Sequence, residues 1–235
     1  MAANRRQEMT MEILKRDSLH EGGFAGLKEH RLVKEPQLFG AQENNDGSWP
    51  GIGNFVYLAD ARFMPHGETN MHSHHEIDVI SVMVDGNIKH EGSLESGKDL
   101  IRNDVQVQRA GGEGFSHNEI NPDDTWNRML QLWVLPEVAG QAADYKIYKP
   151  VAGELTRIYG GEKNEVNDFP AKTKIDVVLL GSGKTIEVDE PFLAYVTSGN
   201  GQVNNEPVEE GDLIRGDTIK FEAMNDVQLI VIHMG

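Results

Sequence analysis

The 235-residue chain contains no cysteine. This absence excludes disulfide bonds, thiolate metal ligands and cysteine nucleophiles. A chain without cysteine can fold in a reducing compartment, and we expect a cytoplasmic protein.

Long apolar runs are also missing from the sequence. No run approaches the roughly 18 residues that a membrane-spanning helix needs. The first residues, from Met1 to Arg16, are charged and lack the apolar core of a secretory signal peptide. We therefore expect no association with a membrane.

Positive charge is scarce in this chain. It has 22 Lys and Arg residues against 38 Asp and Glu residues, for a net charge of −16. A nucleic-acid backbone would be repelled overall, which argues against direct nucleic-acid binding. An acidic, solvated surface that keeps a cytosolic protein soluble explains the charge.

Long amphipathic helices are absent as well, and residues 137–145 could form at most a short one. Many short strand-like segments are separated by turns, consistent with 25 Gly and 9 Pro. This pattern predicts an all-β sandwich or barrel. The expected strands are residues 10–14, 55–63, 77–84, 87–91, 105–109, 129–135, 175–180, 185–188, 192–197, 201–203, 212–214, 218–223 and 227–233. Residues 24–54 are expected to form a wrapping loop with short strands, and residues 137–175 a connector.

The two halves of the chain echo each other. Residues 99–104 and 212–217 differ at one position, and each segment follows a strand, a glycine-containing turn and a short return strand. We interpret this as a duplicated β domain. The first copy, residues 1–140, holds the histidine-rich segment, whereas His233 is the only histidine of residues 141–235.

Two pairs of polar side chains have the spacing of metal ligands on strands. His72 and His74 share a face because side chains alternate along a strand, and so do His117 and Glu119. Two such pairs on neighbouring strands could offer three nitrogens and one carboxylate oxygen to one ion. This set fits a mononuclear transition metal. The alternative is a hydrogen-bonded polar patch at the mouth of a barrel.

Three further side chains are candidates for a substrate pocket. Asp78 is expected on the face of the first histidine pair, either as an outer carboxylate beside the metal or as a polar residue at the end of the strand. Gln131 is expected to line the cavity, and Trp133 is a cavity wall or core filler. His66 and His90 are interpreted as ordinary polar residues.

The motifs around these residues resemble those of the cupins. Gly67-x4-His72-x-His74-x3-Asp78-x7-Gly86 resembles the first cupin motif, with Asp where Glu is usual, and Gly114-x2-His117 resembles the second. Together with Leu130-Gln131-Leu132-Trp133-Val134, they resemble the pirin family, particularly its short bacterial members. The resemblance is strongest over residues 54–137. Ser73 stands where pirins commonly have proline.

The resemblance implies a bicupin, an all-β fold of two face-to-face cupin (jelly-roll) barrels. It implies one metal in the N-terminal barrel, residues 1–140, and none in the C-terminal barrel, residues 141–235. Some pirins cleave the flavonol quercetin with dioxygen. Others act as iron-dependent, redox-sensitive protein partners, including transcriptional coregulators.

Two functions therefore compete. The first is a metal-dependent dioxygenase of the quercetin 2,3-dioxygenase type, acting with O2 on a small planar aromatic substrate such as a flavonol. Glu119 would be both a metal ligand and the proton acceptor. Fe(II) is the first choice, while Mn, Ni, Co, Cu and Zn stay open because ligand type does not settle the metal. The second is a metal-dependent, redox-sensing binding module or transcriptional coregulator, with a protein partner and no turnover. Isomerase or small-sugar chemistry has less support, since the pirin-like motifs are closer.

Overall fold

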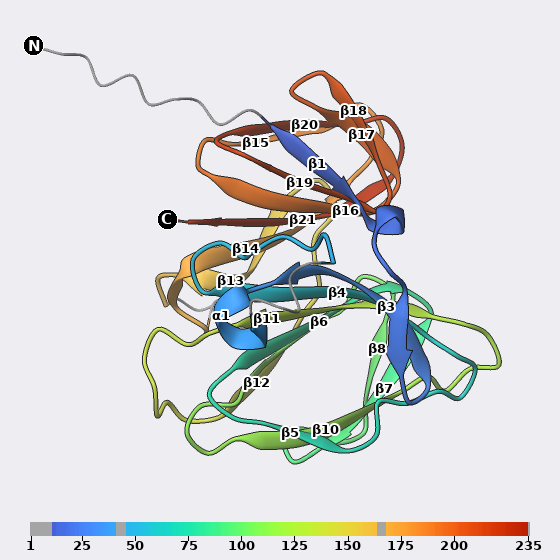
Figure 1. Ribbon diagram of the computed structural model, residues 1–235, viewed down its shortest axis with the longest axis vertical. Helices are drawn as coiled ribbons and strands as arrows, with labels where there is room; N and C mark the ends of the chain where they lie inside the picture. The colour runs from blue at the N-terminus through green and yellow to red at the C-terminus, as the bar shows by residue number, and fades with distance from the viewer. Residues whose placement is uncertain (1–10, 41–45, 164–167, 235) are drawn as a thin grey trace, which may run out of the picture.

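The structure is a computed structural model that describes residues 11–40, 46–163 and 168–234. Its strands form two large and two small sheets. In Figure 1 most of the N-terminal half, coloured blue to green, lies below the orange and red C-terminal half. One large sheet of each half faces the other across the boundary between the halves. The expected all-β bicupin architecture is confirmed by this arrangement.

The N-terminal half contains a seven-stranded and a four-stranded sheet. The seven-stranded sheet has the order β12 (Asp144–Tyr148), β9 (Val105–Arg109), β6 (Asp78–Asp85), β11 (Arg128–Val134), β4 (Phe55–Phe63), β3 (Leu27–Lys34) and β2 (Gly22–Phe24). The four-stranded sheet has the order β5 (His72–His74), β10 (Phe115–Ile120), β7 (Asn87–Gly92) and β8 (Lys98–Ile101).

The C-terminal half contains a six-stranded and a second four-stranded sheet. The six-stranded sheet has the order β1 (Glu12–Lys15), β19 (Asp212–Gly216), β16 (Phe192–Ser198), β21 (Val227–Met234), β14 (Ala171–Leu180) and β13 (Leu155–Gly161). The four-stranded sheet has the order β15 (Thr185–Val188), β20 (Ile219–Ala223), β17 (Asn200–Val203) and β18 (Glu206–Glu209).

Helical structure is limited to two short segments of the described residues, η1 (Arg16–Ser18) and α1 (Pro36–Phe39). The suggested helix over residues 137–145 is wrong, because residues 137–143 are irregular and β12 begins at Asp144. Neither helical segment in the described ranges has the length and apolar character needed to cross a lipid bilayer.

The strand order repeats between the halves, so the domain is duplicated. The order β9-β6-β11-β4-β3 matches β19-β16-β21-β14-β13, and the two small sheets match strand for strand. The six-residue echo, however, does not mark equivalent positions. Residues 99–104 run from β8 into the turn before β9, whereas residues 212–216 form β19, the counterpart of β9. The duplication is therefore visible in strand order and not in this segment.

Each half completes its large sheet with an edge strand from a distant part of the chain. Strand β1, near the N-terminus, pairs with β19 of the C-terminal half, with Glu12 opposite Arg215. Strand β12, beyond residue 140, pairs with β9 of the N-terminal half, with Asp144 opposite Arg109. The division at residue 140 stays a prediction.

The largest hydrophobic core lies between the two large sheets. It joins side chains of both halves, among them Leu58, Ile80, Val107 and Leu132 with Ile175, Val177, Leu193 and Ile232. A second apolar core fills the C-terminal barrel, with members such as Phe192, Val203, Phe221 and Val231. The N-terminal barrel holds smaller apolar clusters, which leaves space inside it for polar side chains.

A buried carboxylate links the two halves across this core. Asp60 on β4 accepts hydrogen bonds from the guanidinium of Arg128, whose Nε lies 2.8 Å away, and from the Tyr195 hydroxyl of the C-terminal half. Arg16, beside the C-terminal sheet, also approaches Asp60, at 3.2 Å. A buried charge needs such partners to offset its desolvation, so this cluster ties the halves together.

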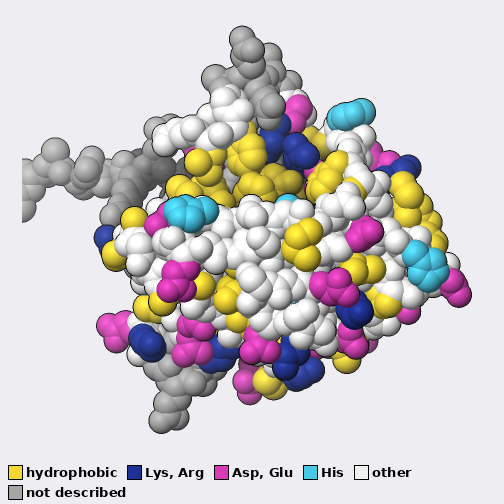
Figure 2. Space-filling view, turned by 90° about the horizontal axis from the view of Figure 1, so that it is seen from below, with side chains coloured by type: hydrophobic (Ala, Val, Ile, Leu, Met, Phe, Trp, Pro, Cys, Tyr) yellow, Lys and Arg dark blue, Asp and Glu magenta, His cyan; other side chains and the backbone are white. Residues whose placement is uncertain are grey.

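The outer face of the N-terminal barrel is uneven. Figure 2 shows this face from below, with hydrophobic side chains gathered in a hollow in the upper part of the view and a histidine at its edge. Charged side chains of both signs are scattered over the rest of the face.

Candidate metal centre

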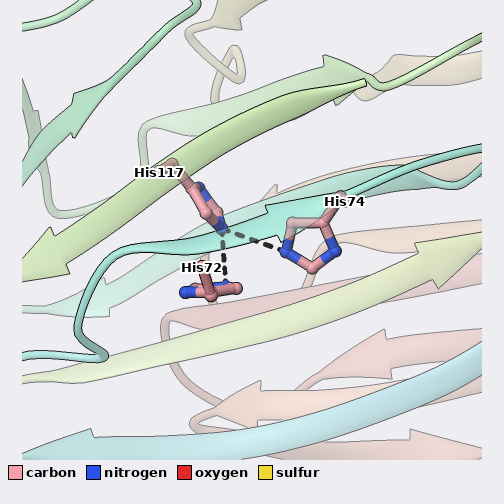
Figure 3. A group of neighbouring side chains, drawn as sticks. All are labelled: His72, His74 and His117. Carbon is pink, nitrogen blue, oxygen red and sulfur yellow. Dashed lines mark hydrogen bonds between the residues drawn. The ribbon is translucent and has the colours of Figure 1, made fainter. Parts of the chain in front are cut away.

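The three predicted histidines come together inside the N-terminal barrel. Strands β5 and β10 are antiparallel neighbours that place His117 opposite His72. The Nε2 atom of His117 lies 3.0 Å from Nε2 of His72 and 3.2 Å from Nε2 of His74, as Figure 3 shows. One nitrogen from each ring lies within 4.8 Å of the others. This is the spacing expected of side chains that share one ion.

Two glycines allow strands β5 and β7 to lie close to the neighbouring β10. Gly114 precedes β10 with φ +73°, and a Cβ there would lie 2.9 Å from the carbonyl oxygen of His74. A Cβ on Gly92 of β7 would lie 2.6 Å from the carbonyl oxygen of Ser116. Glycine is thus needed at both positions for strand spacing, and at Gly114 also for its left-handed backbone.

The chemistry of the rings fits a divalent metal. Burial lowers the pKa of His74 to about 4 and that of His117 to about 2, and the neighbouring imidazoles act in the same direction. These two rings are therefore neutral at physiological pH, the form in which histidine binds metals. In His72, Nδ1 lies 2.8 Å from the main-chain oxygen of Asn70, which can only accept a hydrogen bond. Nδ1 must carry the hydrogen, so Nε2 presents its lone pair.

Glu119 lies near this cluster but outside the set of close ligand atoms. Its carboxylate is fully buried and accepts hydrogen bonds from the Ser81 hydroxyl, at 2.7 Å, and from the Gln131 amide, at 3.1 Å. Burial raises the pKa of Glu119 to about 7, although both hydrogen bonds oppose the rise. The assignment of Glu119 as a fourth ligand stays a prediction.

Asp78 points away from the histidines, contrary to the expectation of a shared face. It lies in the layer between the halves, where it accepts hydrogen bonds from Arg109, at 3.0 Å, and from the Tyr159 hydroxyl, at 2.7 Å. The alternation of faces fails because β5 ends at His74 and Glu76 has φ +51° before β6 begins. Asp78 is therefore an inter-barrel residue and not part of the pocket.

Aromatic side chains form a wall beside the cluster. The indole of Trp133 stacks on Tyr57, with ring centroids 4.4 Å apart, and meets the ring of His74 edge-on at 5.7 Å. Phe39 of α1 extends the wall by stacking on Tyr57 at 5.5 Å. The buried indole Nε1 of Trp133 has no hydrogen-bond partner in the part of the chain that the structure describes. Trp133 is thus covered by Tyr57 on one face and carries a buried donor without a partner among the described residues.

One inward-facing histidine, His90, did not emerge from the sequence pattern. His66 is exposed and pairs with Asp124, as an ordinary polar residue would. His90, in contrast, is fully buried, and its ring centroid lies 5.6 Å from that of His117. The sequence does contain a sign that His90 is buried. Two residues apart on one strand, His90 and Ile88 share a face, and Ile88 belongs to the core of the barrel.

Comparison with known proteins agrees with this architecture. The family model described as Pirin matches residues 43–134, which include all three histidines and Glu119. A Zymomonas mobilis protein named "Putative quercetin 2,3-dioxygenase ZMO1337" is 26% identical over 89% of this chain and 94% of its own.

Solved structures share the fold over almost the whole chain. Bacterial pirin YhhW from Escherichia coli, in complex with nickel(II), superposes with a TM-score of 0.81 at 14% identity, covering 96% of this chain and 99% of its own. Quercetin 2,3-dioxygenase from Acinetobacter baumannii superposes with a TM-score of 0.71 at 17% identity, covering 97% and 86%. The matching domain, the related sequences and the shared bicupin fold make this chain similar to the pirin family, with a Pirin domain over residues 43–134.

Proposed function

We propose that this chain is a metal-dependent dioxygenase of the quercetin 2,3-dioxygenase type. It would cleave a flavonol or a related planar aromatic substrate with O2. The observation that carries the proposal is the convergence of three imidazoles beside a buried carboxylate and an aromatic wall. The names of a sequence relative and of a structural neighbour support the same activity.

His72, His74 and His117 would hold the metal, with Glu119 as the fourth ligand. Fe(II) is our first choice, and the nickel complex of the Escherichia coli pirin supports keeping nickel among the alternatives. Once bound, the metal would bring the substrate and dioxygen together and supply the redox chemistry.

The metal is assigned to the N-terminal barrel alone. Apolar side chains fill the interior of the C-terminal barrel. Its histidine, His233, is engaged on both ring nitrogens, by Glu190 at 2.6 Å and by Asp176 at 2.9 Å. These contacts leave this ring without a free lone pair for an ion.

Glu119 is suited to accept the proton of a substrate hydroxyl. Without a metal, burial raises the pKa of Glu119 to about 7, so this carboxylate is more basic than an ordinary glutamate. Ser81 and Gln131 each donate to one carboxylate oxygen. Each oxygen keeps a second lone pair, so one oxygen could face the metal while the other takes up the proton.

The aromatic wall would bind the planar rings of the substrate. Trp133, which is only partly buried and lies beside His74, would contact the substrate rings. Aromatic rings in contact contribute about 0.5–1.5 kcal/mol beyond their burial. The wall would therefore bind the substrate, whereas the histidines would hold the metal and Glu119 would accept the proton.

The Glu119→Gln substitution tests the role of this carboxylate. Glutamine keeps nearly the same shape but cannot accept the proton, so turnover should fall by about 10²–10⁴-fold, the usual loss for a general base. Oxygen consumption and flavonol loss are measured for metal-loaded wild type and variant, with metal content determined in each. Glu91→Gln, at a partly exposed glutamate on neighbouring β7, is the control and should keep full activity.

Undiminished turnover in Glu119→Gln would remove Glu119 from the mechanism. Absence of turnover in wild type loaded with Fe, Mn, Ni, Co or Cu, across several flavonols, would instead favour the metal-dependent binding module.

A further inference from the structure

A chain of buried hydrogen bonds lies behind His117. Gln106, Gln108, His90 and His117 are all fully buried inside the N-terminal barrel. The side-chain oxygen of Gln108 lies 3.0 Å from Nδ1 of His117, and its amide nitrogen lies 3.2 Å from Nε2 of His90. Gln106 donates to the same Gln108 oxygen at 2.7 Å. The hydroxyl of Tyr145, at 3.0 Å, donates to Gln106.

The direction of every bond follows from the far end of this chain. Nδ1 of His90 lies 2.8 Å from the main-chain oxygen of Glu95, which can only accept a hydrogen bond. Nδ1 therefore carries the hydrogen, and in the neutral ring that burial favours, Nε2 is an acceptor. Gln108 must then turn its NH2 toward His90 and its oxygen toward His117.

The oxygen of Gln108 imposes one tautomer on His117. Since this oxygen only accepts, Nδ1 of His117 must carry the hydrogen. Nε2 of His117 is then left with its lone pair, directed at Nε2 of His72 and His74. His72 already presents a lone pair there, because its Nδ1 donates to the main chain of Asn70.

We propose that Gln108 is a positioning residue that locks His117 in the Nδ1–H tautomer and so keeps its Nε2 ready to bind a metal. The inference rests on the proposed function in taking the meeting point of the histidines as the metal position. The tautomer of His72 is fixed by the main-chain oxygen of Asn70, a partner that no side-chain substitution removes. The tautomer of His117 depends on the side chain of Gln108.

Nitrogen-15 NMR of the histidine rings tests the tautomer without any metal. In the chelator-treated full-length protein, His117 and His72 should both be Nδ1–H. In Gln108→Leu, His117 should lose this preference and populate Nε2–H. His72 should stay unchanged in the same spectrum, as an internal control. An Nε2–H tautomer of His117 in wild type would overturn the proposal even if no variant folded.

Zinc affinity, measured by competition with a chelator, provides the second readout. Gln108→Leu should bind zinc about 10–100-fold more weakly than wild type, the usual cost of removing a partner of a metal-binding histidine. Gln108→Glu keeps an acceptor for Nδ1 and should retain most of the affinity. Gln228→Leu is the matched control, since Gln228 is buried and bonded to the main chain of Met83 in the inter-barrel layer. It should lower stability but leave the tautomer and the zinc affinity intact.

A folded Gln108→Leu variant with an unchanged tautomer and unchanged zinc affinity would refute the positioning role. If His117 is Nδ1–H in wild type but wild type binds no transition metal, the tautomer lock stands and the proposed function fails.

Discussion

Replacing His74 by alanine should lower the affinity for the metal by about 10²–10³-fold. A four-ligand site binds with about 10–16 kcal/mol in total, or roughly 2.5–4 kcal/mol per ligand, and 1.4 kcal/mol is a factor of ten. His74 lies on the short strand β5 and is only half-buried, so the fold should survive. Elemental analysis after dialysis, together with a competition titration, measures the loss.

The control for this prediction is the adjacent histidine. Nε2 of His75 lies 3.1 Å from the main-chain oxygen of Gly112, and His75 is not part of the histidine cluster. His75→Ala should keep the metal at wild-type occupancy. Full occupancy in His74→Ala, or equal losses in both variants, would contradict the assignment of His74 as a ligand.

Replacing Asp60 by alanine should destabilise the protein by about 3–5 kcal/mol. The substitution leaves the buried guanidinium of Arg128 without its main counter-charge, and such losses have this size. The Tyr195 hydroxyl also loses its acceptor. Denaturation in urea, followed by a spectroscopic probe of folding, measures the change in the free energy of unfolding.

A control substitution tests whether the loss of stability is specific to the buried carboxylate of Asp60 or follows the removal of any paired carboxylate. Glu187 forms an ion pair with Lys220 in which both side chains are about two-thirds exposed. Glu187→Gln should change stability by less than about 1 kcal/mol. An Asp60→Ala variant as stable as Glu187→Gln would show that the inter-barrel ion pair does not hold the halves together.

The Asp60 contribution should also depend on pH. Burial alone would raise the pKa of Asp60, but its hydrogen bonds to Arg128 and the charge of that group hold the pKa below its usual value. A lowered pKa in the folded state means stability that is present above the unfolded pKa of about 3.9. It is lost as pH falls through the folded pKa. The difference between wild type and Asp60→Ala should therefore shrink below about pH 4.

The strands with unambiguous patterns could be predicted from the sequence. The ranges expected for β4, β9 and β15 match the structure residue for residue, because apolar and β-branched residues there are bounded by clear turns. Strand β3 was read as part of a wrapping loop. Five of its eight residues are charged or histidine, and the apolar face that packs against the core is short.

The inside of the N-terminal barrel was harder to predict, for a physical reason. A strand with alternating polarity usually turns its polar face to water. In β9 the apolar face, Val105 and Val107, packs into the layer between the barrels, while Gln106 and Gln108 point into the barrel. The apolar face of such a strand packs against the second barrel and its polar face lies inside its own barrel. From the sequence alone, the polar face looks exposed to solvent although it is buried.

The misplaced Asp78 shows a second limit. Alternation predicts a shared face only while the backbone stays extended, and one left-handed residue, Glu76, reverses the faces beyond it. The three histidines were correctly grouped, because His72 and His74 lie within one uninterrupted strand and His117 lies on the strand paired with it.

Anomalous X-ray scattering from crystals of the metal-loaded protein is the most direct test of the central claim. We expect a single peak at the absorption edge of the metal, within bonding distance of Nε2 of His72 and His117 and of a ring nitrogen of His74. A strong peak elsewhere in the molecule, with none between these three histidines, would contradict the claim that they form the metal centre.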